Sequence, residues 1–136
     1  MTGVQTCALP IFDQHKVQSV IHFAALIVVP ESVAKPLQYY KNNTVNAHAL
    51  ISTVVEAGVP NFIFSSTAAV YGTTAPLPTR EDSPIAPDSP YGASKAEAEL
   101  AVRDAAAAGG LPHAICRLAN VYGPRQRGDE IGRAHV

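Results

Sequence analysis

The sequence predicts an α/β fold with a parallel sheet. Three short apolar runs of strand length lie at residues 17–25, 61–66 and 113–118, and two longer segments with helical periodicity lie between them. The order strand, helix, strand, helix, strand favours parallel pairing, because each helix returns the chain to the same end of the sheet. With 136 residues, 47% of them hydrophobic, the chain is long enough to form one domain with a core.

The first strand is predicted at residues 17–25, where VQSVIHFAA is rich in apolar and β-branched residues. Such a run is typical of a strand that is covered on both faces. The first helix is predicted at 36–58, because apolar residues recur every three or four positions and Gly58 and Pro60 then stop it. The positions expected on its apolar face are Leu37, Tyr40, Thr44, Ala47, Ile51, Val54 and Val55.

The second and third strands are predicted at NFIFSS and HAICRL, and a second helix is predicted between them. Ser89 is a good N-cap, Pro90 suits the first helical position, and an alanine-rich run continues to the stop at Gly109. The segment 73–90 contains five prolines and is predicted to be a surface loop near the strand ends. Open α/β sheets bind ligands at that edge.

Three polar side chains converge on this edge of the predicted sheet. Tyr91 and Lys95 are four residues apart at the start of the second helix, and Thr67 is the last of three hydroxyls where the second strand ends. A phenol ionises near pH ~10, so Tyr91 needs a neighbouring cation such as Lys95 to act as a base at neutral pH. A hydroxyl at Thr67 is suited to bond a substrate oxygen beside the phenol.

Each of these features also has an ordinary structural explanation. Tyrosine and lysine at this spacing occur on many solvated helices, and hydroxyls at a strand end commonly bond loop amides. His22, within the first strand pattern, is more typical of a packed core histidine than of a base. These residues therefore indicate an active site only in combination with further motifs.

Composition narrows the possible partners. The formal net charge is -1 and no basic block is present, so nucleic acid is not an expected partner. The longest unbroken apolar run, residues 23–29, is far shorter than the roughly 20 residues of a membrane span. A cytoplasmic protein is therefore expected. The two cysteines form no C-x-x-C pair and lie near no histidine cluster, so no metal site is expected.

The two ends of the chain lack the periodicity of the remainder. Residues 1–12 and 128–136 resemble translated adapter sequence, and they are predicted to be a non-native leader and tail. Residues 13–127 are predicted to form the native unit.

The motifs SSTAAVYG, SPYGASK and RLANVYGPRQ together resemble the extended short-chain dehydrogenase/reductase family. Within this family, HFAALIVVPESVAKPLQYYKNNT and NFIFSSTAAVYG are most similar to bacterial UDP-glucose 4-epimerases. The resemblance spans residues 17–126 and implies a partial doubly wound, Rossmann-like parallel sheet. It also implies an internal fragment that lacks the first βαβ portion, with its glycine-rich phosphate loop, and the C-terminal substrate lobe.

The resemblance implies roles for individual residues. Tyr91 is the implied acid and base for the sugar 4-hydroxyl, Lys95 the residue that holds the nicotinamide ribose and favours the phenolate, and Thr67 a further ligand of the same hydroxyl. The implied substrate-binding residues are Thr67, Tyr91 and Asn120. The residues implied to contact NAD are Phe23, Ala24, Ala25, Leu26, Asn42, Tyr91 and Lys95.

The implied reaction is inversion at C4 of a UDP-hexose, interconverting UDP-glucose and UDP-galactose by transient hydride transfer to NAD. Ala68 and Ala69 stand where related dehydratases carry an acid and a base, which disfavours dehydration. Another NAD(P)-dependent nucleotide-sugar oxidoreductase or reductase, and a fragment without catalytic activity, remain alternatives. The resemblance further implies a homodimer of the intact protein, formed through the two long helices.

Overall fold

The computed structural model describes residues 3–121 and 123–124 of the chain. Helices and strands alternate along it as predicted, with several short elements added. In chain order the elements are α1 (Gly3–His15), β1 (Val20–His22), α2 (Val29–Ala34), α3 (Pro36–Tyr39), a π-helical turn (Tyr40–Val45), α4 (Asn46–Glu56), β2 (Phe62–Thr67), a 3₁₀ turn (Ala68–Tyr71), α5 (Pro90–Gly109) and β3 (His113–Leu118).

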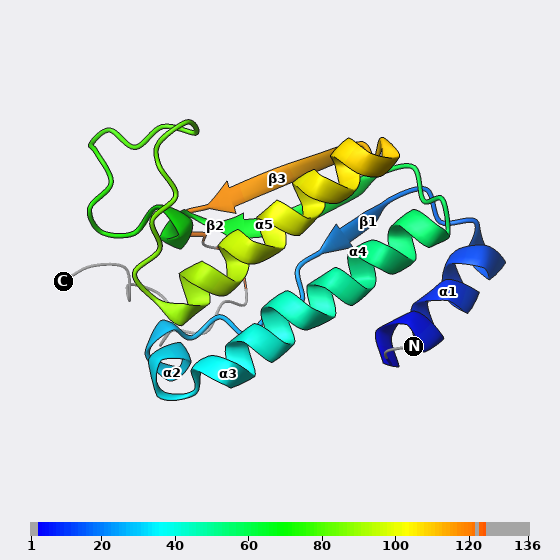
Figure 1. Ribbon diagram of the computed structural model, residues 1–136, viewed down its shortest axis with the longest axis horizontal. Helices are drawn as coiled ribbons and strands as arrows, with labels where there is room; N and C mark the ends of the chain where they lie inside the picture. Colours follow the sequence, from blue (N-terminus) through cyan, green and yellow to red (C-terminus); the bar gives the residue numbers. More distant parts are fainter. Residues whose placement is uncertain (1–2, 122, 125–136) are drawn as a thin grey trace.

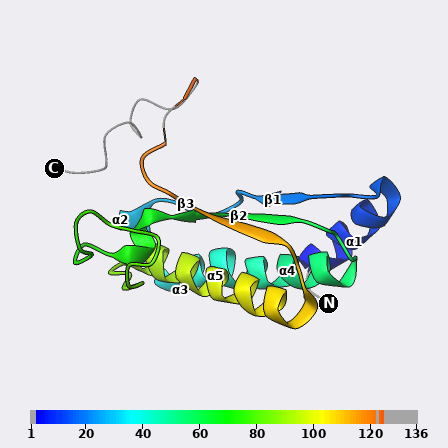
Figure 2. The same ribbon diagram turned by 90° about the horizontal axis from the view of Figure 1, so that it is seen from above.

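The strands form one parallel sheet in the order β1, β2, β3, which confirms the predicted fold class. All three residues of β1 pair with the first half of β2, with His22 opposite Phe64. All six residues of β2 pair with β3, ending at Thr67 opposite Leu118. Helices α4 and α5 make the two crossovers and lie side by side on one face of the sheet (Figures 1 and 2).

The core lies between this helix pair and the sheet. Phe62 and Phe64, two residues apart on β2, point toward the helices because side chains alternate along a strand, and both are fully buried. Each buried aromatic side chain stabilises the fold by roughly 1.5–3 kcal/mol relative to an exposed one. The remaining members of the core are Ala47, Ile51, Val54, Val59, Ala98, Val102 and Leu111.

The opposite face of the sheet is open among the described residues, which corrects the prediction of coverage on both faces. Ile21 of β1 is 53% exposed, and the residues of β3 are exposed or half-buried along their whole length. The first strand is also shorter than the predicted 17–25. Beyond His22 the backbone stops pairing with β2 and is bonded by side chains of the first long helix instead.

The first long helix forms as three joined segments, and the predicted apolar face holds only in part. Ile51 on α4 is buried as predicted, but Leu37 is 81% exposed, and Tyr39 and Asn43 are buried in its place. The π-helical turn is the physical reason, because its wider turn shifts the phase of every side chain on one side of it relative to the other. Val55 is a second predicted face position that the structure exposes.

Helix α1 lies where no element was predicted. It runs beside α4 (Figure 1), and its Phe12 packs against the core. The identification of residues 1–12 as a non-native leader stays a prediction. The predicted tail, residues 128–136, lies outside the described part of the chain. Within the described ranges, no helix has both the length and the apolar character of a membrane span.

Candidate active site

Helix α5 places three polar residues on one face at intervals of four, Tyr91, Lys95 and Glu99, and this face lies against the end of β2. The Lys95 ammonium donates to the backbone carbonyl of Ser65 at 2.8 Å. The hydroxyl of Ser66 donates to the carboxylate of Glu99. Two consecutive residues of β2 therefore each hold one residue of the α5 face.

The start of α5 is positioned by a cap and by a glycine. As predicted, Ser89 caps the helix, and its hydroxyl accepts from the amide of Gly92 at 3.2 Å. A Cβ on Gly92 would lie 2.6 Å from the carbonyl oxygen of Ala69, closer than any real side chain allows. The glycine therefore lets the first turn of α5 approach the 3₁₀ turn after β2, and this approach brings Tyr91 to Thr67.

The hydroxyl of Thr67 accepts from the backbone amide of Ala69 at 3.2 Å, so its own hydrogen is free to donate to the Tyr91 phenol. Burial raises the pKa of Tyr91, and the hydrogen bond from Thr67 opposes this by lowering it. The net pKa is raised, so the phenol is protonated at neutral pH. That Lys95 favours the phenolate of Tyr91 stays a prediction, and in the described structure its ammonium bonds the Ser65 carbonyl.

Lys95 is only 3% exposed, and burial lowers its pKa to about 8. Its ammonium lies 4.9 Å from the centre of the Phe64 ring. The ring of His22 stacks on the same Phe64 at 5.8 Å. Burial, and secondarily the charge of Lys95, lower the pKa of His22 to about 4, so His22 is a neutral packed histidine.

The residues implied to contact NAD follow β1 at the same edge of the sheet. Phe23 and Ala24 are exposed, Ala25 and Leu26 are half-buried, and the backbone of Leu26 is bonded to the side chain of Asn43. The small side chains of Ala24 and Ala25, and the exposure of Phe23 and Ala24, leave room for a dinucleotide to approach the backbone. The described residues therefore fit the proposed cofactor.

Two further predicted contacts lie nearby. Asn42 is half-buried, and its amide donates to the side chain of Asn43 at 3.0 Å. Asn120 is exposed, two residues beyond the Leu118 that pairs with Thr67. The structure thus brings Thr67, Tyr91 and Lys95 together at the end of β2, and Asn120 lies two residues beyond the end of the neighbouring strand β3.

Residues 4–136 match the NAD dependent epimerase/dehydratase family. The chain belongs to this family. A UDP-glucose 4-epimerase of Azospirillum brasilense is 52% identical over 113 residues, which make up 83% of this chain and 32% of that protein. The chain therefore spans about a third of the length of this curated relative.

Solved structures of family proteins share the fold. The UDP-Glc/GlcNAc 4-epimerase of Campylobacter jejuni superposes with a TM-score of 0.80 at 44% identity, covering 85% of this chain and 36% of that one. A dTDP-glucose 4,6-dehydratase of Streptomyces venezuelae, solved with NAD bound, superposes with a TM-score of 0.83 at 33% identity, covering 94% and 40%. Similarity of fold therefore extends to both epimerases and dehydratases.

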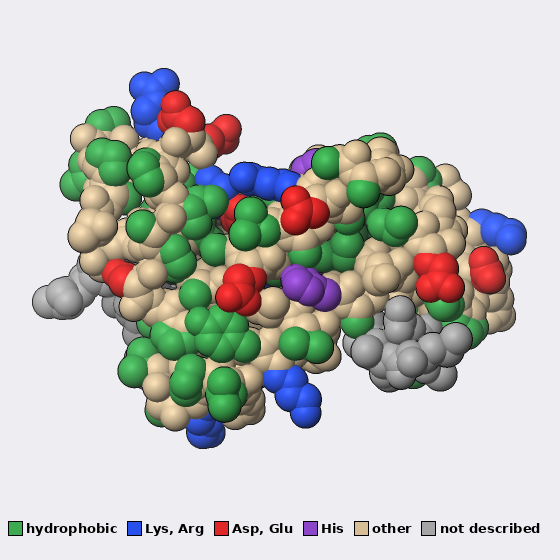
Figure 3. All heavy atoms as spheres, in the orientation of Figure 1, with side chains coloured by type: hydrophobic (Ala, Val, Ile, Leu, Met, Phe, Trp, Pro, Cys, Tyr) green, Lys and Arg blue, Asp and Glu red, His purple; other side chains and the backbone are tan. Residues whose placement is uncertain are grey.

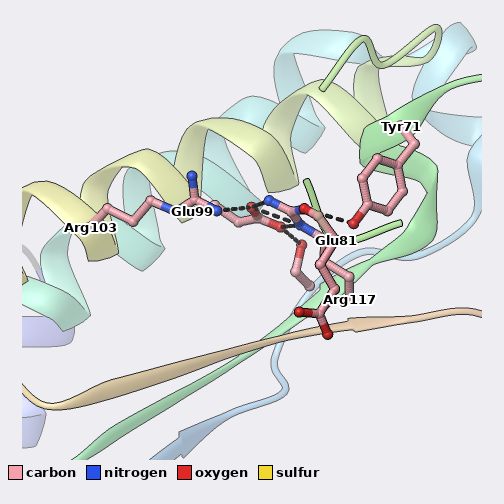
Figure 4. A network of polar contacts seen from close by, with 6 residues as sticks. Tyr71, Glu81, Glu99, Arg103 and Arg117 are labelled. Carbon is pink, nitrogen blue, oxygen red and sulfur yellow. Dashed lines mark hydrogen bonds and ion pairs between the residues drawn. The ribbon is translucent and has the colours of Figure 1, made fainter. Parts of the chain in front are cut away.

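The chain also contains a buried polar network that the sequence analysis did not predict (Figure 4). Glu99 is 1% exposed and accepts from Arg117 of β3, with the shortest contact at 2.7 Å. Arg117 also donates to the hydroxyl of Tyr71 at 2.7 Å and to the backbone carbonyl of Glu81 at 3.0 Å. Its pKa is raised well above the usual value, chiefly by the bond to Glu99. The network joins α5, β3, the 3₁₀ turn and the proline-rich loop.

We predict that His22 makes the fold sensitive to acid. Between pH 6.5 and 4 the unfolded chain binds a proton at this position and the folded chain does not, so the free energy of unfolding falls as the pH is lowered through this window. The expected loss is up to about 3 kcal/mol. Urea unfolding of the wild-type chain and of His22→Gln at several pH values measures it, and the variant should lose less.

The exposed His15 at the end of α1 provides the matched control, because His15→Gln makes the same chemical change away from the stacked pair of His22 and Phe64. This variant should follow the wild-type pH dependence. Equal losses in the wild type and in His22→Gln between pH 6.5 and 4 would contradict the assignment.

Proposed function

We propose that the full-length protein carrying this chain is a cytoplasmic, NAD-dependent epimerase that inverts C4 of a UDP-hexose and interconverts UDP-glucose and UDP-galactose. The observation that carries the proposal is the meeting of Thr67, Tyr91 and Lys95 at one strand end, beside the exposed segment 23–26. The 52% identical relative that is a UDP-glucose 4-epimerase supports the substrate class. Cell fractionation tests the location.

The three side chains divide the proton chemistry among them. Tyr91 is the group that takes the proton of the sugar 4-hydroxyl, which it can do only as the phenolate, and later returns it. Thr67 donates to the phenol oxygen and so stabilises the phenolate form against the effect of burial. Lys95, with a pKa of about 8, remains mainly protonated at neutral pH and supplies a positive charge one helical turn away. NAD, when bound, supplies the acceptor for the C4 hydride.

The two residues that follow Thr67 favour epimerisation over dehydration. Ala68 and Ala69 begin the 3₁₀ turn, and both are half-buried at the end of β2. Loss of water across two sugar carbons needs a second pair of proton-transfer groups, and methyl groups cannot transfer protons. The S. venezuelae dehydratase therefore shares the fold, while the chemistry proposed for this chain differs.

The test is an assay of the full-length protein with NAD and UDP-glucose, or UDP-N-acetylglucosamine, followed by NMR of the sugar products. The expected product is the C4 epimer, without net accumulation of NADH. Tyr91→Phe should lower turnover by about 100-fold or more with an unchanged melting temperature. Tyr40→Phe is the control, since Tyr40 has no side-chain hydrogen bond within the described part of the chain.

Two results would overturn the proposal. Release of a 4-keto product or stoichiometric NADH would indicate a dehydratase or an oxidoreductase. Near-normal turnover in Tyr91→Phe would remove the assigned proton-transfer group.

We further propose that the full-length protein is a homodimer formed through α4 and α5. The outer surfaces of these helices form an open groove of about 440 Å³, which lies on the face shown in Figure 3. Small side chains line much of it and would allow a second helix to approach closely. The lining residues are His48, Ile51, Ser52, Val55, Ala101, Ala105, Ala108 and Gly109.

Sedimentation velocity measures the assembly. We expect the mass of a dimer for the wild-type protein and of a monomer for Ala105→Arg, because a guanidinium group would be buried without a partner. Ala107→Arg, on an exposed position of the same helix outside the groove, should remain dimeric. A dimer that persists in Ala105→Arg would place the interface elsewhere.

A further inference from the structure

Two buried side chains of the first long helix hold the segment that follows β1. The side-chain oxygen of Asn43 accepts from the Leu26 amide at 2.8 Å, and its nitrogen donates to the Leu26 carbonyl at 2.9 Å. The Tyr39 hydroxyl accepts from the Val28 amide at 3.0 Å and donates to the Val28 carbonyl at 2.8 Å. Each side chain therefore satisfies both backbone groups of one residue, as a neighbouring strand would.

The two bonded residues, Leu26 and Val28, lie two positions apart, and both are held through their backbone groups. Asn43 is 2% exposed and Tyr39 is fully buried, so both act from the interior. Ile27, between the two bonded residues, is exposed, as are Phe23 and Val28. The backbone of the segment is thus held by two buried side chains, while the side chains of Phe23, Ile27 and Val28 remain exposed.

The same asparagine connects this segment to the helix that carries the proposed catalytic residues. Its side-chain nitrogen also lies 3.2 Å from the hydroxyl oxygen of Ser94, and that hydroxyl donates to the backbone carbonyl of Tyr91 at 2.8 Å. A short path of hydrogen bonds therefore runs from Leu26 through Asn43 and Ser94 to Tyr91. The π-helical turn contains Asn43, and such turns occur frequently at functional sites.

We propose that Asn43 and Tyr39 are positioning residues that fix segment 23–28 relative to Tyr91 and Lys95 and so preorganise it for NAD. This inference rests on the proposed function and adds the residues that set the geometry of its cofactor site. Neither residue acts on the cofactor directly. Each acts through the backbone of the segment, and a segment that is already ordered loses less conformational freedom when a ligand binds.

The test uses the full-length protein with Tyr39→Phe and Asn43→Leu as separate variants. Tyr39→Phe keeps the buried ring and removes only the hydroxyl, so it remains folded even if the asparagine variant does not. We expect NAD to bind about tenfold more weakly to each variant, the effect of losing one or two net hydrogen bonds. Hydrogen–deuterium exchange at residues 26 and 28, followed by mass spectrometry, should become faster in the absence of NAD.

Two controls separate positioning from other effects. Tyr40→Phe makes the same change on the adjacent, half-buried tyrosine and should leave both readouts unchanged. The Tyr39 hydroxyl also contacts Glu31 at 3.1 Å, so Glu31→Ala shows what the loss of that contact contributes. It should change NAD affinity less than Tyr39→Phe does.

The outcomes are distinguishable. Variants that have a lower melting temperature but bind NAD with wild-type affinity would show a merely structural role and overturn the inference. Unchanged exchange at residues 26 and 28 would also overturn it. A wild-type protein that binds no NAD, with exchange still faster in the variants, would contradict the proposed function itself and leave the segment with no cofactor to be positioned for.

Discussion

The buried carboxylate of Glu99 is the constraint on which the arrangement of the site depends. Removing an ionised carboxylate from water costs several kcal/mol unless it is paired and hydrogen-bonded. Arg117 from β3 and Ser66 from β2 satisfy it, and they lie on two different strands. Because both partners must be reached at once, α5 has one rotation and one height on the sheet. Lys95 and Tyr91, four and eight residues earlier, are thereby placed against the end of β2.

Other contacts position the site from different directions. Gly92 lets the first turn of α5 approach the 3₁₀ turn, and the arginine of the Glu99 pair extends to Tyr71 and to the backbone of the proline-rich loop. On the far side of β2, Asn43 fixes the backbone of Leu26. The proposed proton-transfer residues and the proposed cofactor segment are therefore held by separate elements that meet at one sheet edge. The proposed reaction needs both groups at this edge, and the packing of each element places them there.

The sequence predicted those features that local signals encode. The cap at Ser89, with proline after it, gave the start of α5 correctly, and apolar runs gave β2 and β3 to within one residue. Tyr91 and Lys95 were placed on one helix face because they are four residues apart. Glu99 follows Lys95 by four more residues, so the same rule would have placed it on that face.

Non-local contacts could not be predicted in this way. The partner of Glu99 depends on the register of β2 with β3, which spacing along the chain does not contain. The π-helical turn has no residue signature, so the predicted face placed Leu37 inward and missed Asn43. The same limit applies to the bond from the Lys95 ammonium to the Ser65 carbonyl, which joins residues 30 positions apart in the sequence.

A double-mutant cycle on the Glu99–Arg117 pair tests most directly whether this contact holds α5 on the sheet. Urea unfolding of Glu99→Gln, Arg117→Met and the double variant gives the coupling free energy. Breaking a buried pair from one side costs about 3–5 kcal/mol, so we expect each single variant to be strongly destabilised and the coupling to reach about 2 kcal/mol or more. If the destabilisations of the two single variants add up to that of the double variant to within about 0.5 kcal/mol, the pair is not coupled and the account is contradicted.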